Sequence, residues 1–303
     1  MTVAQAPASE LESAWLAQAR WSEASNRAKA SFVRWQRVAV CLTVGAAVAT
    51  TAASQLPASC DVARRVMSFG AALAVALLAL VGRNWTSPAR MREWIRARSV
   101  SEGLKSEIYL YVTRSGRYRK GDADDAFAEQ HATIVNGAAD LTRITADVTP
   151  AAKPVPPNPM PVTDYFQQRV DGQVQKFYRP KARSEATLVS RYRKAEFVLA
   201  ALATAIAVHA SASGTTPFAA WGAVITTTLA TLAAHLAAGR HEYQLTTYTA
   251  TWLELERLSA RFKDKSAKGA LDADALDSLV VQAEAAISVE NQGWMAQWKE
   301  PNS

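Results

Sequence analysis

The sequence contains little cysteine, which limits the disulfide and metal chemistry open to it. Only two of its 303 residues are cysteines, Cys41 and Cys60, too few for a disulfide framework or a four-thiolate metal site. If the helix between them is continuous, they lie about 28 Å apart at 1.5 Å per residue, which is too far for a disulfide within one chain. A reduced protein that faces the cytosol is the simpler interpretation.

Catalytic signatures are missing as well. The chain has no glycine-rich phosphate loop, no Cys-x-x-Cys pair and no Gly-x-Ser-x-Gly elbow. His241-Glu242 begins like a zinc-protease motif, but Leu245 stands where the second histidine is needed. The other histidines, at positions 131, 209 and 235, lack the spacing of a metal site. We therefore expect no catalytic residue, no metal site, no cofactor and no enzymatic activity.

Charge is absent from four long stretches, although the chain carries 34 Lys/Arg and 27 Asp/Glu residues. No charged residue lies between Arg37 and Asp61, between Arg65 and Arg83, or from Phe197 to Gly239. A turn-like stretch at 211–217 divides the last of these. The apolar parts cover 38–56, 66–82, 197–213 and 218–239, each near the roughly 20 residues that cross a bilayer.

These runs allow two interpretations, because they are rich in Ala, Thr and Gly rather than Leu and Ile. Four buried helices of a soluble bundle would need a charged outer stripe, which the runs lack. Basic residues gather at one end of the runs and aromatic residues at the edges, as in membrane proteins. We therefore predict an all-α polytopic membrane protein with four transmembrane helices in two hairpins. The basic residues are Arg34, Arg37, Arg83, Arg90, Arg92, Arg191, Arg193, Lys194 and Arg240, and the aromatic ones are Trp35, Trp85, Tyr192, Phe218 and Trp221.

The positions of the basic residues also predict the orientation. The positive-inside rule places both termini, the middle of the chain and long helical extensions in the cytoplasm, in a multi-pass protein of the inner (plasma) membrane. The start of the chain is polar and carries Glu10 and Glu12, so no signal peptide is expected. The net charge of +7 then favours anionic lipid as a partner. Direct binding of nucleic acid is not expected, because a soluble basic helical protein would need charge on its central helices.

A repeat relates the two halves of the chain at an offset of 157 residues. Trp21 corresponds to Tyr178, Arg34 to Arg191, and Gly82-Arg83 to Gly239-Arg240. Further on, a Lys-Gly loop precedes an acidic helix start in each half, at Lys120 to Asp125 and at Lys268 to Asp274, after a nine-residue gap. We predict a first unit at 1–148 (hairpin about 38–82) and a second at 163–303 (hairpin about 197–239). The segment 149–162 between them holds six of the twelve prolines and is expected to be a semi-rigid linker.

The segments outside the runs show helical periodicity and no strand pattern. Apolar residues at helical spacing are Trp94, Ile95, Leu104, Ile108 and Tyr111 in the first half, and Leu245, Tyr248, Trp252, Leu255 and Phe262 in the second. Leu276, Val280, Ala283 and Ile287, followed by Trp294 and Trp298, form the face of a final helix.

Polar residues inside the runs are the candidates for a function in the membrane. Thr227, Thr231 and His235 share one face of the fourth run, and Thr43, Thr50 and Ser54 form a looser stripe on the first. They could line a water-filled path once several chains assemble. The alternative is that the hydroxyls bond to their own helix backbone, while small residues such as Gly45, Ala49 and Ala53 permit close packing.

The segment from Arg83 to Lys120 carries ten Lys/Arg residues against three Asp/Glu. A solvated face near anionic lipid headgroups is the simple explanation. The alternative is a binding surface for a phosphorylated signal or nucleic acid, for which Arg96, Arg98 and Lys105 are the candidates.

The stretch from Trp94 to Glu107 (WIRARSVSEGLKSE), which follows a hairpin and leads to Arg117-Tyr118, resembles the SLATT domain. The second half is similar to that family too, with Arg191-Tyr192-Arg193-Lys194 before its hairpin and Glu290 to Trp294 near its end. The resemblance implies a two-transmembrane effector of bacterial conflict systems that forms pores or perturbs the membrane. The trigger would be a partner that detects infection, often through a nucleotide second messenger. The two tandem units and the lack of a separate sensor domain depart from that pattern.

The leading hypothesis is therefore an oligomeric membrane effector in antiviral defence, triggered through its cytoplasmic helices by a nucleotide second messenger or an upstream sensor protein. The alternative is a non-conducting membrane scaffold that recruits partners through the same helices.

Overall fold

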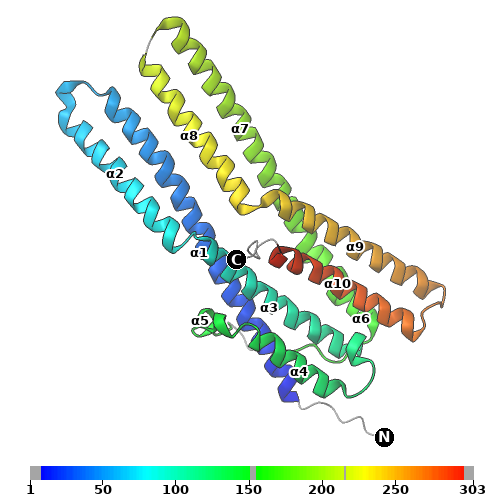
Figure 1. The fold of residues 1–303 in the computed structure, drawn as a ribbon. Helices are drawn as coiled ribbons and strands as arrows, with labels where there is room; N and C mark the ends of the chain where they lie inside the picture. Colours follow the sequence, from blue (N-terminus) through cyan, green and yellow to red (C-terminus); the bar gives the residue numbers. More distant parts are fainter. Residues whose placement is uncertain (1–7, 151–154, 215, 297–303) are drawn as a thin grey trace. The chain divides into compact units, whose positions relative to one another are not determined.

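A computed structural model describes residues 8–150, 155–214 and 216–296 (Figure 1). Within these ranges every regular element is helical and no strand occurs, which confirms the all-α prediction. The chain forms two compact units. The core unit comprises residues 1–29, 91–182 and 246–303, and the hairpin unit comprises residues 30–90 and 183–245.

Each half of the chain contains a helical hairpin followed by two further helices, α3 and α4 in the first half and α9 and α10 in the second. The α-helices are α1 (Ala8–Gln55), α2 (Asp61–Asn84), α3 (Pro88–Val112), α4 (Ala123–Asn136), α5 (Thr142–Thr145), α6 (Val162–Tyr165), α7 (Arg179–Ser213), α8 (Thr216–Gly239), α9 (His241–Ala267) and α10 (Ala273–Ala296). Short 3-10 turns are η1 (Ala58–Cys60), η2 (Gly116–Tyr118) and η3 (Ala139–Leu141), and two π-helical segments are η4 (Phe166–Asp171) and η5 (Val174–Tyr178).

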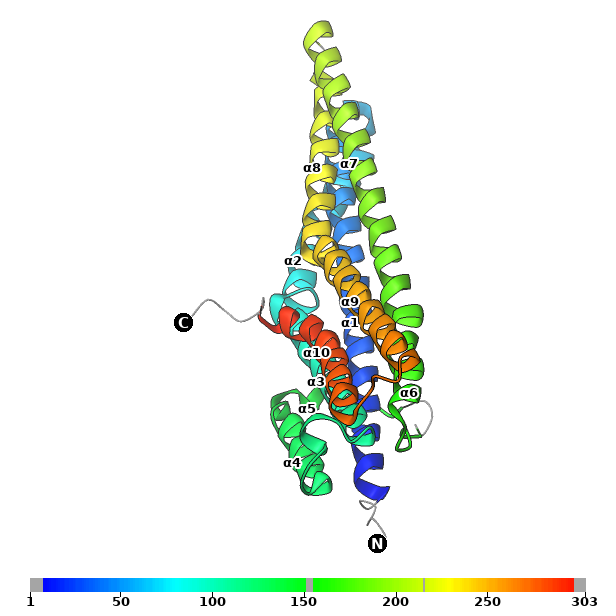
Figure 2. The same cartoon turned by 90° about the vertical axis from the view of Figure 1, so that its right-hand side faces the viewer.

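The hairpin unit contains two antiparallel helix pairs, α1 with α2 and α7 with α8 (Figures 1 and 2). Helix α1 ends at Gln55, two residues before Pro57, which cannot donate a backbone hydrogen bond and so favours the turn. Gly214 follows α7 with a φ of +67°, within the turn predicted at 211–217. All four helices are long and apolar enough to cross a membrane, as the charge-free runs predicted.

Helix α1 has 48 residues and is therefore about 72 Å long at 1.5 Å per residue. The hydrocarbon core of a bilayer is only about 30 Å thick. A large part of α1 therefore lies outside the hydrocarbon when its apolar run spans it.

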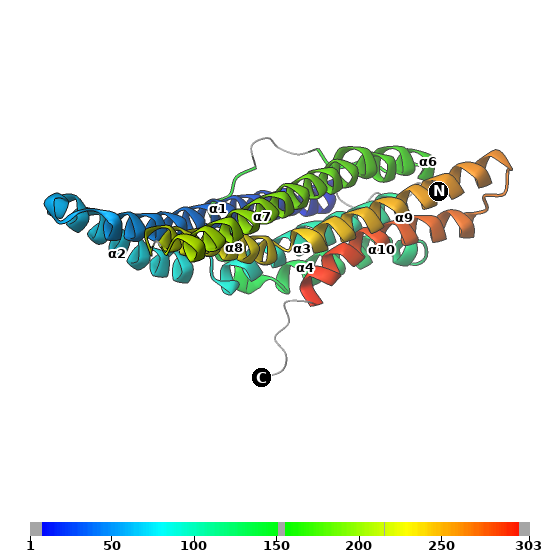
Figure 3. The same ribbon diagram turned by 90° about the horizontal axis from the view of Figure 1, so that it is seen from above.

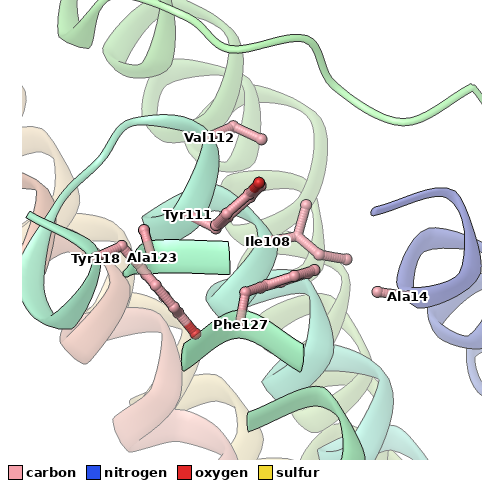
Figure 4. Close-up of a cluster of buried hydrophobic side chains, with 7 residues drawn as sticks. All are labelled: Ala14, Ile108, Tyr111, Val112, Tyr118, Ala123 and Phe127. Atoms are coloured by element: carbon pink, nitrogen blue, oxygen red, sulfur yellow. The ribbon is translucent and has the colours of Figure 1, made fainter. Parts of the chain in front are cut away.

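The core unit is built on the amphipathic faces that the periodicity predicted. Every predicted apolar position of α3 is buried, including Leu104 and Ile108, and Tyr248, Leu255 and Phe262 of α9 are buried as well. In one cluster Tyr111 stacks on Phe127 at 4.4 Å between ring centroids, beside Ala14 of α1 (Figure 4). The full cluster is Ala14, Ile108, Tyr111, Val112, Tyr118, Ala123 and Phe127.

Helices α9 and α10 lie side by side and antiparallel in the core unit (Figure 3). Asp272 caps α10 by accepting a hydrogen bond from the backbone N–H of Ala275 at 2.7 Å. Asp122 caps α4 in the same way, accepting from the N–H groups of Asp124 and Asp125. The acidic helix starts predicted in both halves are therefore N-caps, which satisfy N–H groups that have no partner within the helix.

The predicted segmentation into units at 1–148 and 163–303 stays a prediction, since the core unit draws on both halves. In the predicted linker, residues 151–154 lie outside the described residues, and 155–161 have no regular structure. Of the two final tryptophans, Trp294 lies in α10, and Trp298 lies outside the described residues.

Candidate functional site

The hairpin helices leave their apolar side chains uncovered. At most 11% of the residues in each apolar window are buried within the protein. Large side chains such as Phe69 and Phe197 are 72% and 76% exposed. Monomeric soluble proteins rarely expose apolar area on this scale, and such area marks an interaction with a membrane or a partner. The soluble-bundle alternative therefore fails, because it requires these faces to be buried.

Aromatic rings close each hairpin at the end where its chain enters and leaves. Trp35 of α1 stacks on Trp85, which follows α2, with 4.3 Å between ring centroids and 17° between planes. In the second hairpin Tyr192, the counterpart of Trp35, stacks on His235 at 5.8 Å. Flat amphipathic rings at this position fit an interfacial belt. The placement of Trp35, Trp85 and Tyr192 agrees with the edge positions predicted from the sequence, and His235, predicted to line a path, lies beside Tyr192.

Basic residues lie at both ends of the first hairpin, whereas the sequence predicted them at one end. Arg64 and Arg65 lie in the first turns of α2, at the opposite end of the hairpin from Arg37 and Arg83. Asp61 pairs with both at 2.7 Å, so it neutralises part of that charge. The prediction of basic residues at one end is therefore wrong for the first hairpin, which carries them at both ends. The excess of basic residues at the entry end remains, and with it the orientation stays a prediction.

The intramembrane hydroxyls bond to their own helices where the structure gives their partners. Thr43 donates to the carbonyl of Ala39 at 2.9 Å, and Thr231 to that of Thr227 at 2.7 Å. Ser54 donates to the carbonyl of Thr51, and the Thr50 side chain is exposed. These are the bonds to the helix backbone that the alternative interpretation predicts. They leave the hydroxyl oxygens with spare acceptor capacity, so the pore-lining role of this stripe stays a prediction.

The core unit holds a buried ion pair. Arg169 in η4 and Glu284 in α10 are 1% and 2% exposed, and their side chains form two hydrogen bonds of 3.0 Å. Tyr165 donates a third, at 2.9 Å, to the Oε1 atom of Glu284. Burial alone would lower the pKa of the Arg169 guanidinium, but the charge and hydrogen bonds of Glu284 outweigh it and raise that pKa. The Arg169 guanidinium therefore stays charged in the core.

The sequence reading did not single out this pair, although it held a signal. Glu284 lies four residues after Val280 and three before Ile287, two positions of the apolar face predicted for the last helix. An acidic residue on a face that packs into a core requires a partner, because an unpaired buried carboxylate is costly. Nothing local pointed to Arg169, which lies 115 residues away.

A cleft of about 260 Å³ lies between α3 and the π-helical segments of the core unit. Of the three residues predicted for a binding surface, Arg98 and Lys105 line the cleft, and Arg169 and Lys176 line it from the second half. Their binding role stays a prediction. Arg96 does not belong to this group, because it forms a bidentate ion pair with Asp140 at 2.5 and 2.9 Å. The spacing accounts for the separation, since Arg98 and Lys105 are seven residues apart on one helix face and Arg96 is not on that face.

The architecture is thus that of an all-α membrane protein with two apolar hairpins and a separate packed helical unit. Residues 165–294 match the family model of the SMODS and SLOG-associating 2TM effector domain 1, and residues 17–126 match that of a family of unknown function, DUF4231. The match in the second half is to a SLATT domain, in agreement with the resemblance seen in the sequence. The two matches cover one hairpin each, which agrees with two units in tandem. No curated protein and no solved structure matches the chain.

Proposed function

We propose that this chain is a membrane effector that oligomerises to form a pore or to perturb the bilayer when a signal reaches the helices of the core unit. The observation that carries the proposal is the pair of uncovered apolar hairpins, one of them within a match to a two-transmembrane effector domain. The setting we propose is bacterial antiviral defence or another conflict system. The effector would have no enzymatic activity of its own and would act on the bilayer directly.

The small side chains of the hairpin helices support the proposed oligomerisation. Four helices rich in Ala and Thr, taken alone, are too few to enclose a wide water-filled path. Gly45 on α1 has no neighbouring atom within 4 Å of where a Cβ would stand. A second helix could therefore approach the α1 backbone closely there, as small residues allow in membranes. The proposed partners are the bilayer, further copies of this chain, and a nucleotide second messenger or an upstream sensor protein as the trigger.

Dye release from liposomes tests the proposal directly. Purified full-length protein is reconstituted into liposomes that contain a self-quenching dye, with and without extract from phage-infected cells. We expect the dye to be released. We expect His235→Leu to reduce that release while the protein remains in the membrane after a carbonate wash. Thr204→Leu on α7 is the matched control, since its hydroxyl bonds to the Ala200 carbonyl and lies outside the predicted stripe. Retention in the membrane without any release of dye would favour the scaffold.

A further inference from the structure

The cleft of the core unit has the composition of an anion site. Four cationic side chains line it, from Arg98, Lys105, Arg169 and Lys176, against the single carboxylate of Glu102. Two of the cations come from α3 and two from the segment 166–178, which lies more than 60 residues further along the chain. Glu284 balances the charge of Arg169, and the three other cations still exceed the charge of Glu102, so their mutual repulsion disfavours the cleft without an anion. An anion in the cleft would offset that repulsion.

Two of these cations have unused hydrogen-bonding capacity. The Nη1 atom of Arg169 is buried and has no hydrogen-bond partner among the described residues, although Nε and Nη2 are bonded to Glu284. Lys105 is half-buried and forms no hydrogen bond or ion pair with any residue that the structure describes. Leaving a buried charged donor unsatisfied costs more than a typical hydrogen bond contributes. Such donors therefore point to a ligand with acceptor oxygens.

The backbone around the cleft is also unusual. Gln168 and Arg169 belong to η4, and Lys176 and Phe177 to η5, and both segments are π-helical. The π-helix is rare, and its single turns occur frequently at functional sites. The wider turn moves side chains out of the register of a regular helix. Here it accompanies two of the four cations of the cleft.

We propose that this cleft binds the phosphate group of a small phosphorylated molecule. A phosphate carries one to two negative charges and several acceptor oxygens, which match a guanidinium N–H and lysine ammonium groups. At about 260 Å³ the cleft is smaller than the roughly 300–1,000 Å³ of sites that enclose drug-sized ligands. It therefore encloses the phosphate-bearing end of the molecule and leaves the remainder outside. Tyr109 packs against Arg169 and Phe177 against Arg98 in cation–π contacts at 4.7 and 5.4 Å. These ring faces are therefore not available to the ligand.

A bound phosphate would link α3 to the segment 166–178 through charge-assisted hydrogen bonds. The occupied cleft would hold together two segments that repel each other when it is empty. As a means of triggering the chain, this rests on the function proposed above, whereas binding itself does not. The proposed trigger therefore carries a phosphate group, on a soluble ester or on a lipid headgroup.

Calorimetric titration of the full chain in nanodiscs of neutral phosphatidylcholine tests the site. The probes are inorganic pyrophosphate and ATP, and the variants are Lys105→Gln and Lys176→Gln. Arg169 is left intact because its loss would also break the buried pair with Glu284. We expect saturable binding that weakens about tenfold or more in each variant, as expected for the loss of a charged hydrogen bond. Lys181→Gln is the matched control, an exposed lysine in the first turn of α7 that does not line the cleft, and it should bind like the parent.

A second arm distinguishes the source of the phosphate. The titration is repeated as a flotation assay with phosphatidylcholine vesicles that contain a phosphatidylinositol phosphate, comparing Lys105→Gln with Lys181→Gln. Binding of pyrophosphate or ATP lost only in the cleft variants supports a soluble ligand, and a cleft-dependent difference in this lipid arm alone supports a headgroup. No cleft-dependent binding in either arm, or equal loss in Lys181→Gln, overturns the proposal. Dye release without phosphate binding would overturn the site and leave the effector function unaffected. Phosphate binding without dye release would support the site and contradict the effector function.

Discussion

The backbone N–H of Gly116 donates a hydrogen bond of 2.6 Å to the Oδ1 atom of Asp277, which lies 161 residues further along the chain. The turn after α3 is thereby attached to the first turns of α10. Arg119 of the same turn pairs with Asp274. These contacts join a segment of the first half to one of the second within the core unit.

Replacing either residue of this bond should destabilise the protein. We expect Gly116→Ala to cost about 1–2 kcal/mol, because its φ of +61° strains an L-residue. A Cβ there would also lie 3.3 Å from Cγ2 of Val281. Asp277→Ala should cost a similar amount by leaving the amide unpaired. Urea unfolding of the full chain in detergent, followed by tryptophan fluorescence, measures both. Asp277→Asn keeps an acceptor oxygen and should cost less, and equal losses in the Ala and Asn variants would contradict this explanation.

The buried pair gives a sharper expectation. Glu284→Gln should cost about 3–5 kcal/mol, because it leaves the Arg169 guanidinium buried without a counter-charge. The same change at Glu254, which forms an exposed pair with Arg257 on α9, should cost under about 1 kcal/mol. The double variant Arg169→Met/Glu284→Met should recover part of the loss, since apolar groups need no partner. The measurement is the urea midpoint of each variant. A double variant less stable than Glu284→Gln would argue against an electrostatic origin of the loss.

Lys105 makes the stability depend on pH in a defined direction. Burial lowers the pKa of its ammonium group, the charges of Arg169 and Arg98 lower it further, and Glu102 and Glu284 oppose them. Below the folded pKa the charged lysine is disfavoured in the fold, so Lys105→Gln should be more stable than the parent at neutral pH. As pH rises through the folded pKa toward the unfolded value of about 10.4, the parent gains stability relative to the variant. The difference should therefore shrink with rising pH.

Unfolding of the parent and of Lys105→Gln at a series of pH values from 7 upward checks this, since all other titrating groups are shared. A difference that is constant with pH would refute it. The same substitution is expected to weaken phosphate binding, so it should raise stability and lower affinity together. That combination is typical of a residue retained for binding rather than for folding.

Part of this architecture follows from the sequence and part does not. The hairpins and the faces of α3 and α9 were predictable, because a charge-free run or a helical period is a local pattern that one segment specifies. The separation of Arg96 from Arg98 and Lys105 was also implicit in helical spacing, although the three were grouped. The contribution of Arg169 and Lys176 to the cleft was not predictable, because it depends on the docking of a segment from the other half. The π-helical turns at 166–178 had no sequence signal that we could identify.

Assembly in the membrane should depend on the open face at Gly45. Gly45→Leu fits the single chain, since nothing lies within 4 Å of the new Cβ, but it would block close approach of another helix. We expect a lower oligomer fraction after cross-linking in native membranes, with unchanged retention after a carbonate wash. Val48→Leu on the same helix, at an exposed position that already carries a large side chain, is the control. A lower oligomer fraction in both variants would point to general damage to α1. An unchanged oligomer fraction in both would remove Gly45 from the interface.

The two cysteines provide a test of orientation. Both are free and exposed in the protein, Cys41 in α1 and Cys60 in the turn η1. If the predicted topology holds, a membrane-impermeant maleimide added outside spheroplasts should label Cys60, while lipid shields Cys41, which lies three residues inside the first run. Cys60→Ser should then abolish labelling and Cys41→Ser should not. Rapid labelling of Cys41 in intact cells would show that the run is not in lipid.

The uncovered hairpins also constrain how a cell can produce this protein. Phe69, Phe197 and their neighbours would meet water if the finished chain were released from the ribosome into the cytosol, and such surfaces aggregate. The chain therefore has to be delivered to the membrane while it is being made, or be held by a chaperone until it arrives. Its abundance is then set by the capacity of the insertion machinery as well as by its gene, and a cell that makes it too fast should accumulate it in inclusion bodies.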